Sequence, residues 1–259
     1  MKCRLCNSDT SQIHQALILG RFPAHYDRCN ACQFLQVRNP EWLSTNFDLG
    51  VISADTGIME RNLWLSRLVT VFLGLTACRS GPFVDYAGGV GLFTRLMRDA
   101  GFDFRHNDPF TANLLARGFE DDRAEPITGV TLFEVLEHLT NPREILADIF
   151  ARKPKILIAT TLPYKMPLDP NWWYLCLQTG QHVAFYNAAT LAYIGQQFGY
   201  HVLSVGSVHV FSVEKIPRWK LLLAVNLAAP LFRWFRKPSL VQTDFAFMIA
   251  KLESRQNAP

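Results

Sequence analysis

The stretch from Gly81 to Phe110, GPFVDYAGGVGLFTRLMRDAGFDFRHNDPF, decides the fold of this chain. Its pattern predicts a short buried strand ending at Asp85, a glycine turn, a helix, and a second strand followed by Asp108. Glycine has no Cβ, so such a turn can bend sharply and let a ligand approach the backbone closely. An acidic residue after the second strand can accept hydrogen bonds from the hydroxyls of a ribose. The stretch therefore predicts a nucleoside cofactor at the carboxyl edge of a parallel sheet.

The glycine turn, D-x-A-G-G-x-G from Asp85 to Gly91, narrows the class of cofactor. A dinucleotide fingerprint counted from Gly89 would need a third glycine where Thr94 stands. A phosphate-binding loop would need a Lys-Ser or Lys-Thr pair after the glycines, and the sequence has none there. The alternative interpretation is an ordinary strand-to-helix turn that needs glycine only for packing.

The composition is that of a soluble globular protein. The chain has 259 residues, of which 49% are hydrophobic and 19% charged, enough for one sizeable α/β domain and a small module. A net charge of +4 is mildly basic and does not by itself indicate a nucleic-acid partner. We find no basic start followed by an apolar run, and no uncharged apolar stretch of membrane-spanning length. We therefore expect no signal peptide and a location in the reducing cytoplasm.

Four cysteines near the start of the chain predict a metal site. Cys3 and Cys6 form one C-x-x-C pair, and Cys29 and Cys32 form a second pair after an intervening loop. Four thiolates can close a tetrahedron around Zn²⁺ and leave no position for a substrate, so we expect a structural zinc ribbon. The alternative is four unrelated thiols. The other two cysteines have no spacing partner, and we interpret them as buried small apolar residues.

We expect four segments along the chain, with the boundary of the first near residues 40 to 55. They are a zinc-ribbon module at 1–42, a linker with a cofactor-covering helix at 43–80, the main α/β domain at 81–253, and a disordered tail at 254–259. Apolar periodicity predicts helices at 55–78, after Pro142, and at 188–198. Further strands are expected at 130–133 and 155–161, with a sixth strand in 199–213 and a seventh, antiparallel strand in 244–252.

A charged string follows the strand at 130–133. It reads E-V-L-E-H from Glu134 to His138. Charged residues at the carboxyl end of a strand lie where an open α/β sheet places its chemistry, so His138 is a candidate catalytic residue. The alternative is a solvated helix start, in which Glu134 and Glu137 favour the positive end of the helix dipole.

An aromatic loop follows the strand at 155–161. It contains W-W-Y at 172–174 and Q-H-V-A-F-Y at 181–186. Flat rings offer stacking area for a sugar or a base, so the loop is a candidate acceptor pocket. His182 could then act as a general base, with Tyr186 or Tyr174 bonding the substrate. Alternatively, His182 packs against or caps the next helix.

Together these motifs resemble the class I S-adenosylmethionine-dependent methyltransferases that carry a zinc ribbon and act on nucleotide-linked sugars and related glycans. The resemblance rests on the cysteine pairs, the D-x-A-G-G-x-G turn, the E-V-L-E-H string and the aromatic Q-H-V loop, in that order. It implies an α/β, Rossmann-like fold, with a seven-stranded, mostly parallel sheet sandwiched by helices. It also implies that methyl transfer occurs by in-line displacement. Ala87 departs from the family pattern, because it stands where the first glycine is usual.

The resemblance also implies roles for particular residues. Asp108 would hold the ribose hydroxyls, and Phe133 and Glu134 would line the site near the adenine or the sulfonium. His182 is the first choice of base, beside Tyr186 and His138. The amino-acid end of the cofactor would lie against Asp85, Ala87, Gly88, Gly89 and Gly91.

Three functions remain open at this point. The first is methylation of a small sugar-like acceptor. The second is methylation of RNA or protein held by the ribbon, but only Arg21 and Arg28 are basic between Cys6 and Cys29, so a dense phosphate-binding face is missing and nucleic acid is not expected. The third is an inactive cofactor-binding protein, which Ala87 would favour.

The segment 217–237 is apolar at its middle and flanked by basic residues. It predicts a helical pair that packs on the sheet or at a dimer contact, because Asn226 and Pro230 interrupt it. The other interpretation is an interfacial helix that contacts a membrane carrying a lipid-linked glycan. The oligomeric state stays open.

Overall fold

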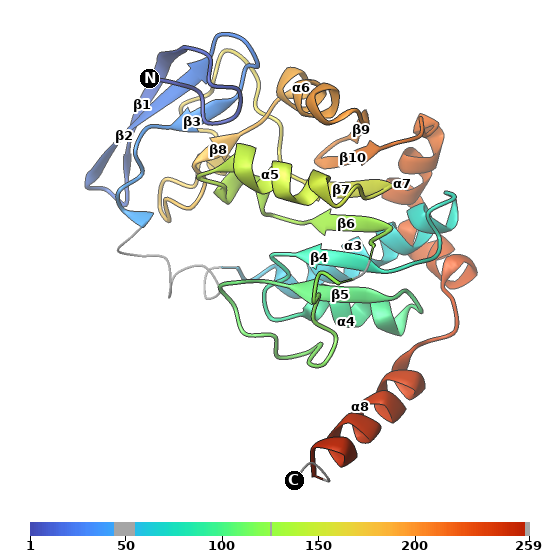
Figure 1. Ribbon diagram of the computed structural model, residues 1–259. Helices are drawn as coiled ribbons and strands as arrows, with labels where there is room; N and C mark the ends of the chain where they lie inside the picture. The colour runs from blue at the N-terminus through green and yellow to red at the C-terminus, as the bar shows by residue number, and fades with distance from the viewer. Residues whose placement is uncertain (44–54, 125, 257–259) are drawn as a thin grey trace. The chain divides into compact units, whose positions relative to one another are not determined.

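A computed structural model describes residues 1–43, 55–124 and 126–256 of the protein (Figure 1). The described strands form two sheets. A four-stranded sheet has the order β1 (Thr10–Ile18), β2 (Phe22–Cys29), β3 (Leu35–Val37), β8 (Ala184–Phe185), with antiparallel pairing throughout. A six-stranded mixed sheet has the order β5 (Phe104–Asn107), β4 (Phe83–Tyr86), β6 (Gly129–Leu132), β7 (Ile156–Thr160), β10 (Val208–Ser212), β9 (His201–Val205).

By its internal contacts the chain divides into two compact units. The first unit comprises Met1–Gly57, Leu132–Lys153 and Leu157–Lys215. The second unit comprises Ile58–Thr131, Pro154–Ile156 and Ile216–Pro259. The predicted boundary near residues 40 to 55 falls mostly on 44–54, which lie outside the described residues, as do the last three residues of the predicted tail.

In the second unit, β4 is the central strand of the local pairing. It pairs in parallel with β5 and with β6, so that Asp85 lies opposite His106 on one side and Thr131 on the other. Aromatic rings of β4, β5 and α4 (Leu92–Asp99) pack against one another. Phe83 stacks on Phe104 at 5.0 Å between ring centroids, and Phe93 of α4 meets Phe104 edge-on at 5.4 Å. The core of this unit thus holds the end of β4 firmly below the glycine turn.

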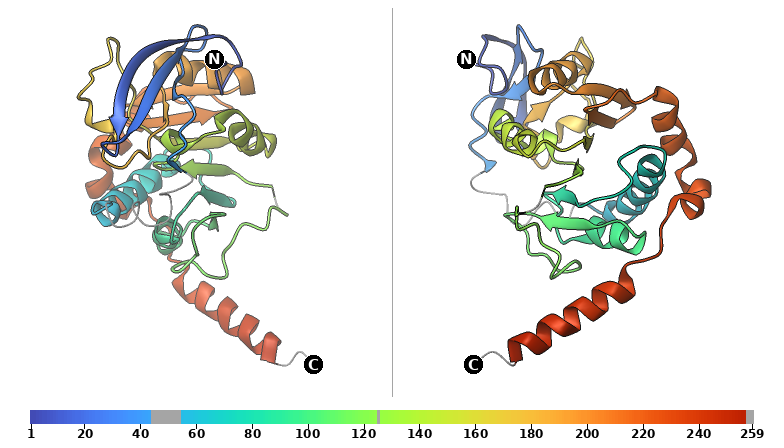
Figure 2. Two further views of the ribbon diagram at one scale, coloured as in Figure 1. Left: turned by 90° about the vertical axis from the view of Figure 1, so that its left-hand side faces the viewer. Right: turned by 45° about the vertical axis from the view of Figure 1, so that its right-hand side comes forward.

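Three further helices belong to the second unit. α3 (Ile58–Gly74) buries an apolar face and packs against α4 and α7 (Arg218–Phe235). α7 is broken by non-helical dihedrals at Leu227 ahead of Pro230, as expected for a proline that removes a helix hydrogen bond. Figure 2 shows α7 and α8 (Val241–Gln256) as separate helices joined by an extended segment. The break at Leu227 confirms the predicted interruption of the 217–237 segment.

The first unit holds the ribbon sheet and the elements from η1 to β10, apart from Ile156 at the start of β7. These elements are η1 (Leu136–His138), α5 (Pro142–Ala151), η2 (Trp173–Leu175) and α6 (Ala188–Phe198), besides β7, β9 and β10. Tyr26 and Leu35 of the ribbon share one buried apolar cluster with Tyr174, Val183 and Phe185 of the aromatic loop. The ribbon and the aromatic loop are thus parts of one core, which the sequence did not indicate.

The structure corrects the prediction of a seven-stranded sheet. The six-stranded sheet contains no strand at 244–252, because these residues lie in the helix α8. Residues 254–256, expected to be disordered, belong to the same helix. The segment 199–213, expected to be one strand, forms the antiparallel hairpin of β9 and β10, with Gly206 at a positive φ of 59° in the turn.

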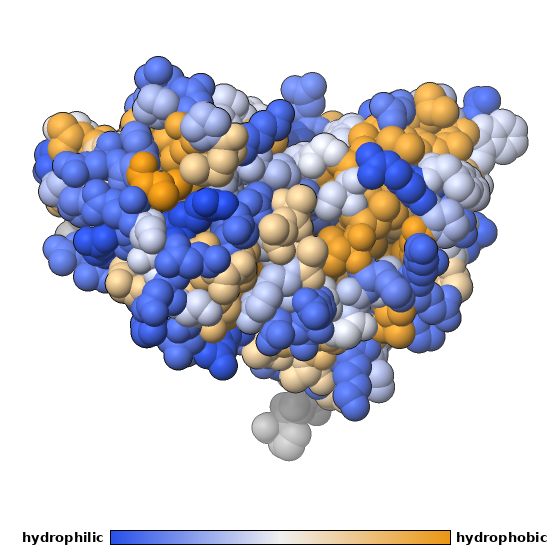
Figure 3. Space-filling model, turned by 90° about the horizontal axis from the view of Figure 1, so that it is seen from above, coloured by the Kyte–Doolittle hydropathy of each residue, from blue (hydrophilic) through white to orange (hydrophobic). Residues whose placement is uncertain are grey.

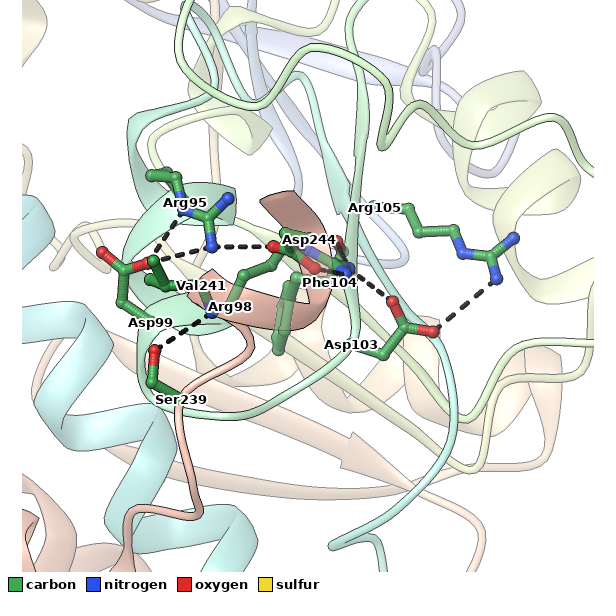
Figure 4. Close-up of polar contacts among 9 residues, drawn as sticks. All are labelled: Arg95, Arg98, Asp99, Asp103, Phe104, Arg105, Ser239, Val241 and Asp244. Atoms are coloured by element: carbon green, nitrogen blue, oxygen red, sulfur yellow. Dashed lines mark hydrogen bonds and ion pairs between the residues drawn. The ribbon is translucent and has the colours of Figure 1, made fainter. Parts of the chain in front are cut away.

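The helical state of 244–252 has a tertiary cause (Figure 4). Asp244 in the first turn of α8 accepts hydrogen bonds from Arg98 at 2.8 and 2.6 Å and from Arg95 at 2.8 Å. Arg98 also donates to the Asp103 carboxylate and to the Phe104 carbonyl. A buried guanidinium needs such a full set of acceptors, and Asp244 supplies two of them from the helix.

None of the described helices is both long enough and apolar enough to cross a membrane. Hydrophobic side chains are nevertheless exposed at several places, as the face in Figure 3 shows. On α7 the exposed ones include Trp219 and Trp234, each with a neighbouring cationic side chain over its ring.

Candidate functional site

The glycine turn of the second unit connects β4 to α4. Gly91 is the residue before the helix and has a left-handed conformation, with a φ of 84°. A Cβ on Gly88 would lie 2.5 Å from the Asp85 carboxylate, so a side chain there would displace the acid. Ala87 also has a positive φ, 55°, a conformation that costs an alanine about 1 kcal/mol or more. The position that departs from the family pattern thus has a backbone suited to glycine.

Asp85 lies under this turn and is almost fully buried. Its two carboxylate oxygens accept hydrogen bonds from the Thr94 hydroxyl at 3.1 Å and from the Thr131 hydroxyl at 3.0 Å. Burial raises the pKa of Asp85 to about 7, although both threonine bonds favour the ionised form. Asp85 therefore supports the turn from below, and the two threonines are site residues that the sequence reasoning missed.

Asp108 follows β5 and bonds directly to the turn. One of its oxygens accepts a hydrogen bond from the Gly89 amide at 2.9 Å. The other accepts from the amides of Phe110 at 2.8 Å and Thr111 at 2.9 Å. A carboxylate has about four lone-pair sites, so capacity for one further donor remains. Phe110 beside it is 87% exposed, an aromatic ring that the sequence reasoning did not single out.

Glu134 and Phe133 belong to the first unit. Glu134 has a positive φ of 55°, a conformation rarely adopted by residues other than glycine. Its amide donates to the Thr160 hydroxyl at 2.9 Å, and that hydroxyl donates to Glu134 Oε1 at 2.7 Å. Strained backbone that is held by specific bonds is often found at functional sites. Phe133 is half-buried.

Glu137 of η1 is fully buried. Its Oε1 accepts a hydrogen bond from the Tyr174 hydroxyl at 2.7 Å. Its Oε2 has no hydrogen-bond partner among the described residues. Burial, and next the nearby charge of Glu134, raise the pKa of Glu137 to about 8. Leaving a carboxylate oxygen without a partner in a closed interior is costly.

Two histidines lie beside Glu137. The Nδ1 atom of His138 lies 3.1 Å from the Gln181 carbonyl, and the Nδ1 atom of His182 lies 2.7 Å from the Tyr174 carbonyl. The two rings meet edge-to-face at 5.0 Å between centroids. Burial lowers the pKa of His138 to about 4 and, with the nearby His138, lowers that of His182 to about 3. Both imidazoles are therefore neutral at pH 7.

Tyr186 is fully buried as well. Its hydroxyl donates to the Leu136 carbonyl at 3.1 Å, and burial raises its pKa well above the ordinary value. The Val183 amide donates to the Glu137 carbonyl at 2.8 Å, which ties the aromatic loop to η1. The structure thus brings His138, His182 and Tyr186 together around η1.

The four N-terminal cysteines gather at one place in the first unit. Their sulfur atoms all lie within 4.8 Å of one another, with 3.7 Å between Cys3 and Cys32 and 3.4 Å between Cys6 and Cys29. These separations are too long for a disulfide, which is about 2.05 Å. They are near the edge of about 3.8 Å expected for sulfurs around Zn²⁺ at about 2.3 Å. Amides of Leu5 and Ala31 point at two of the sulfurs. The residues present fit a zinc ion.

A cavity of about 500 Å³ lies elsewhere in the second unit. Arg98, Arg105, Asp244 and Lys251 are among its lining residues, and no residue of the glycine turn is. It therefore marks the docking of α8 on β5 and α4, and it is not the predicted cofactor site.

Comparison with known proteins identifies the family. The sequence profile described as a methyltransferase domain matches residues 60–205, more than half of the chain. The chain belongs to this methyltransferase-domain family. The match spans every predicted cofactor and catalytic residue and leaves out the four cysteines. Among curated proteins, no sequence matches the chain.

Several solved structures resemble this methyltransferase domain. CalO1, a methyltransferase in calicheamicin biosynthesis with bound SAH, is 17% identical, with 60% of this chain and 55% of that one covered and a TM-score of 0.43. TnmH is 15% identical, with 67% and 61% covered and a TM-score of 0.47. Magnesium protoporphyrin IX methyltransferase from Synechocystis PCC 6803, with bound SAH, is 13% identical, with 66% and 90% covered and a TM-score of 0.46. The chain thus spans little more than half the length of the first two.

Proposed function

We propose that this methyltransferase domain transfers a methyl group from S-adenosylmethionine to a small, sugar-like acceptor. The observation that carries the proposal is the bond between the Asp108 carboxylate and the Gly89 amide. It holds the acid after β5 against the glycine turn after β4, the two parts that the predicted nucleoside site requires.

The residues of the second unit divide the binding of the cofactor between them. Asp108 would hold the ribose by accepting a hydrogen bond from one of its hydroxyls. The turn of Ala87, Gly88, Gly89 and Gly91 would receive the amino-acid end, with Asp85 supporting it. When bound, S-adenosylmethionine supplies an electrophilic methyl on a positively charged sulfur. The domain needs only to orient the acceptor and to allow its proton to leave.

Phe133 and Glu134 of the first unit are proposed to line the site near the adenine or the sulfonium. The strained backbone of Glu134, held by Thr160, supports a role for this residue. Strain of this kind is retained where the position of a side chain is more important than the stability of the local backbone.

The aromatic loop of the first unit is proposed to receive the acceptor. Trp173 is 71% exposed, so its ring offers a flat surface on which a sugar could stack. If the acceptor is a hydroxyl, its proton must leave while its oxygen bonds the methyl and the bond from sulfur to methyl breaks. His182 is the proposed proton acceptor, with His138 and Tyr186 beside it, because its ring is neutral and one nitrogen is unprotonated. Its low pKa makes it a weak base at neutral pH.

Zn²⁺ is the proposed ion of the four-cysteine cluster. With all four positions filled by protein, its role would be to stabilise the ribbon, which shares a core with the aromatic loop. A location in the cytoplasm, and a peripheral membrane contact through 217–237, remain further proposals.

Binding and mass measurements test the proposed function. Wild-type protein is titrated calorimetrically with S-adenosylmethionine and S-adenosylhomocysteine and then incubated with a panel of nucleotide sugars, RNA and peptides. We expect binding and the mass of one added methyl group on a nucleotide sugar. Asp108→Asn should weaken binding about tenfold or more, since charge-assisted hydrogen bonds are the stronger kind. The exposed acid Asp122 supplies the control variant Asp122→Asn.

Three outcomes would contradict the proposal in different ways. No binding at millimolar cofactor would reject the enzyme. Methyl transfer to RNA or to a peptide alone would support the macromolecular alternative. Binding without transfer to any acceptor would support the inactive binding protein.

A further inference from the structure

We propose that Glu137, His138 and His182 form a second metal site, distinct from the four cysteines, which binds one divalent ion of the first transition row. One carboxylate oxygen of Glu137 and one ring nitrogen of each histidine lie within 4.8 Å of one another. All three residues belong to the first unit. Two of them, Glu137 and His182, are buried.

The carboxylate of Glu137 provides independent support. Its Oε1 already accepts the Tyr174 hydroxyl, and its Oε2 is buried with no hydrogen-bond partner among the described residues. A buried acidic oxygen without a donor is costly, because it has lost its hydrogen bonds to water. A metal ion at this oxygen would remove that cost, since buried charges are usually paired or coordinate metals.

Each imidazole has its Nδ1 atom within hydrogen-bond distance of a backbone carbonyl. A carbonyl can only accept a hydrogen bond, so the Nδ1 atoms that face Gln181 and Tyr174 must carry the protons. The lone pair of each neutral ring then lies on Nε2, which in His182 is 3.8 Å from the Cys176 sulfur. Metal-binding histidines almost always donate their other N–H to a carbonyl, a carboxylate or a water in this way.

Tyr174 ties the cluster together. Its hydroxyl donates to Glu137 at 2.7 Å, and its carbonyl accepts from His182 at 2.7 Å. One residue of η2 thus orients two of the three ligands. Such supporting residues around a site hold its ligands in place and strengthen metal binding.

The ligand set selects the class of metal. Two imidazole nitrogens and one carboxylate oxygen suit Zn²⁺, Fe²⁺, Co²⁺ or Mn²⁺, whereas Mg²⁺ and Ca²⁺ favour sites built of oxygen. A tetrahedral ion with bonds of about 2.1 Å would hold its ligands about 3.4 Å apart. The ligand atoms lie up to 4.8 Å apart. Side-chain rotations that shorten these separations to about 3.4 Å would complete the site.

Three protein ligands leave at least one position open, as in catalytic zinc sites. An ion there would lower the pH at which a hydroxyl in the open position loses its proton to solvent. His182 would then be a ligand and not the proton acceptor. The activation of a hydroxyl by the ion rests on the proposed function, whereas binding of the ion does not.

Cobalt titration of the full-length protein tests the site. Chelator-treated protein is titrated with Co²⁺, whose thiolate complexes show a strong near-ultraviolet charge-transfer band that nitrogen and oxygen ligands do not produce. We expect two equivalents of Co²⁺ per chain, one with this band and one without it. Glu137→Gln and His138→Ala should each abolish the second equivalent and leave the first. His201→Gln, which removes an exposed imidazole from the same unit, should keep both.

The wild-type spectrum decides the outcome even if a variant fails to fold. Binding of a single, thiolate-ligated equivalent would overturn the proposal, as would two equivalents in Glu137→Gln. A second equivalent that His201→Gln removes would overturn it too, because it would belong to the surface. Two equivalents without any methyl transfer would uphold the metal site and reject the proposed function. Methyl transfer by a protein that binds only one equivalent of Co²⁺ would uphold the proposed function and reject the metal site.

Discussion

The Tyr174 hydroxyl donates a 2.7 Å hydrogen bond to Glu137 across a separation of 37 residues. Both side chains are buried, and Glu137 Oε2 has no partner among the described residues. This bond joins the aromatic loop to the E-V-L-E-H string and is the centre of the polar cluster in the first unit.

Replacing Tyr174 by Phe should destabilise the protein by about 1–3 kcal/mol, because both oxygens of Glu137 would then be unpartnered. Chemical denaturation followed by circular dichroism measures the change in the free energy of unfolding. The half-buried Tyr193 supplies the control, and Tyr193→Phe should change that free energy by less than about 0.5 kcal/mol. Equal effects of the two variants would show that the bond to Glu137 contributes nothing.

Replacing Ala87 by Gly should stabilise the protein by about 0.5–1 kcal/mol. Relief of the positive φ gains about 1–2 kcal/mol, and the greater freedom of glycine in the unfolded chain costs about 0.4–1 kcal/mol. Urea unfolding measures the difference. Ala189→Gly, at an exposed position inside α6, should have the opposite sign and cost about 1 kcal/mol. Destabilisation by both variants would mean that Ala87 is not strained.

The raised pKa of Asp85 predicts a loss of stability as the pH rises. Below its ordinary value of 3.8 the carboxyl is protonated in both the folded and the unfolded states. Between 3.8 and about 7 only the unfolded state ionises, which favours unfolding, and above about 7 the loss is complete. The slope from this group is at most about 1.4 kcal/mol per pH unit.

Denaturant unfolding from about pH 4 to about pH 8 measures this contribution. Relative to wild type, Asp85→Asn should gain stability as the pH rises, since Asn does not ionise. The exposed control Asp122→Asn should follow the wild-type curve. Parallel curves for wild type and Asp85→Asn would show that the carboxyl is not perturbed.

Replacing Asp244 by Asn should release α8. Its carboxylate accepts three hydrogen bonds from Arg95 and Arg98, and breaking a buried ion pair costs about 3–5 kcal/mol. Limited proteolysis should then cleave α8 faster, and the free energy of unfolding should fall. Asp99→Asn breaks the exposed pair with Arg95 and should cost no more than about 0.5 kcal/mol. A proteolysis rate equal to that of wild type would contradict the assignment.

If the four cysteines hold Zn²⁺ as proposed, removing it should unfold the ribbon and loosen the aromatic loop that shares its core. Cys3→Ser should lose one equivalent of zinc by elemental analysis and lower the melting temperature. Cys78→Ser, outside the cluster, should keep the zinc. A zinc content of Cys3→Ser equal to that of wild type would place the ion elsewhere.

Short-range patterns in the sequence determined much of the fold. The helix at Ala188–Phe198 was predicted with the bounds observed, and in the structure Asn187 caps its start and Gly199 ends it. The turn between β4 and α4, the strands β6 and β7, and the gathering of the four cysteines followed in the same way. Each of these depends on residues that are neighbours in the chain or repeat at a fixed spacing, so the sequence carries the signal directly.

Tertiary contacts decided the rest. The run from Asp244 to Leu252 has the apolar content of a strand, but its Asp244 bonds to Arg98, 146 residues away, from the first turn of a helix. Likewise, Glu137, His138 and His182 were separate candidates in the sequence, and only the folding of the aromatic loop over η1 places their ligand atoms within 4.8 Å. Periodicity reports local conformation. The partner of a buried charge is chosen by packing between distant segments, which no local pattern encodes.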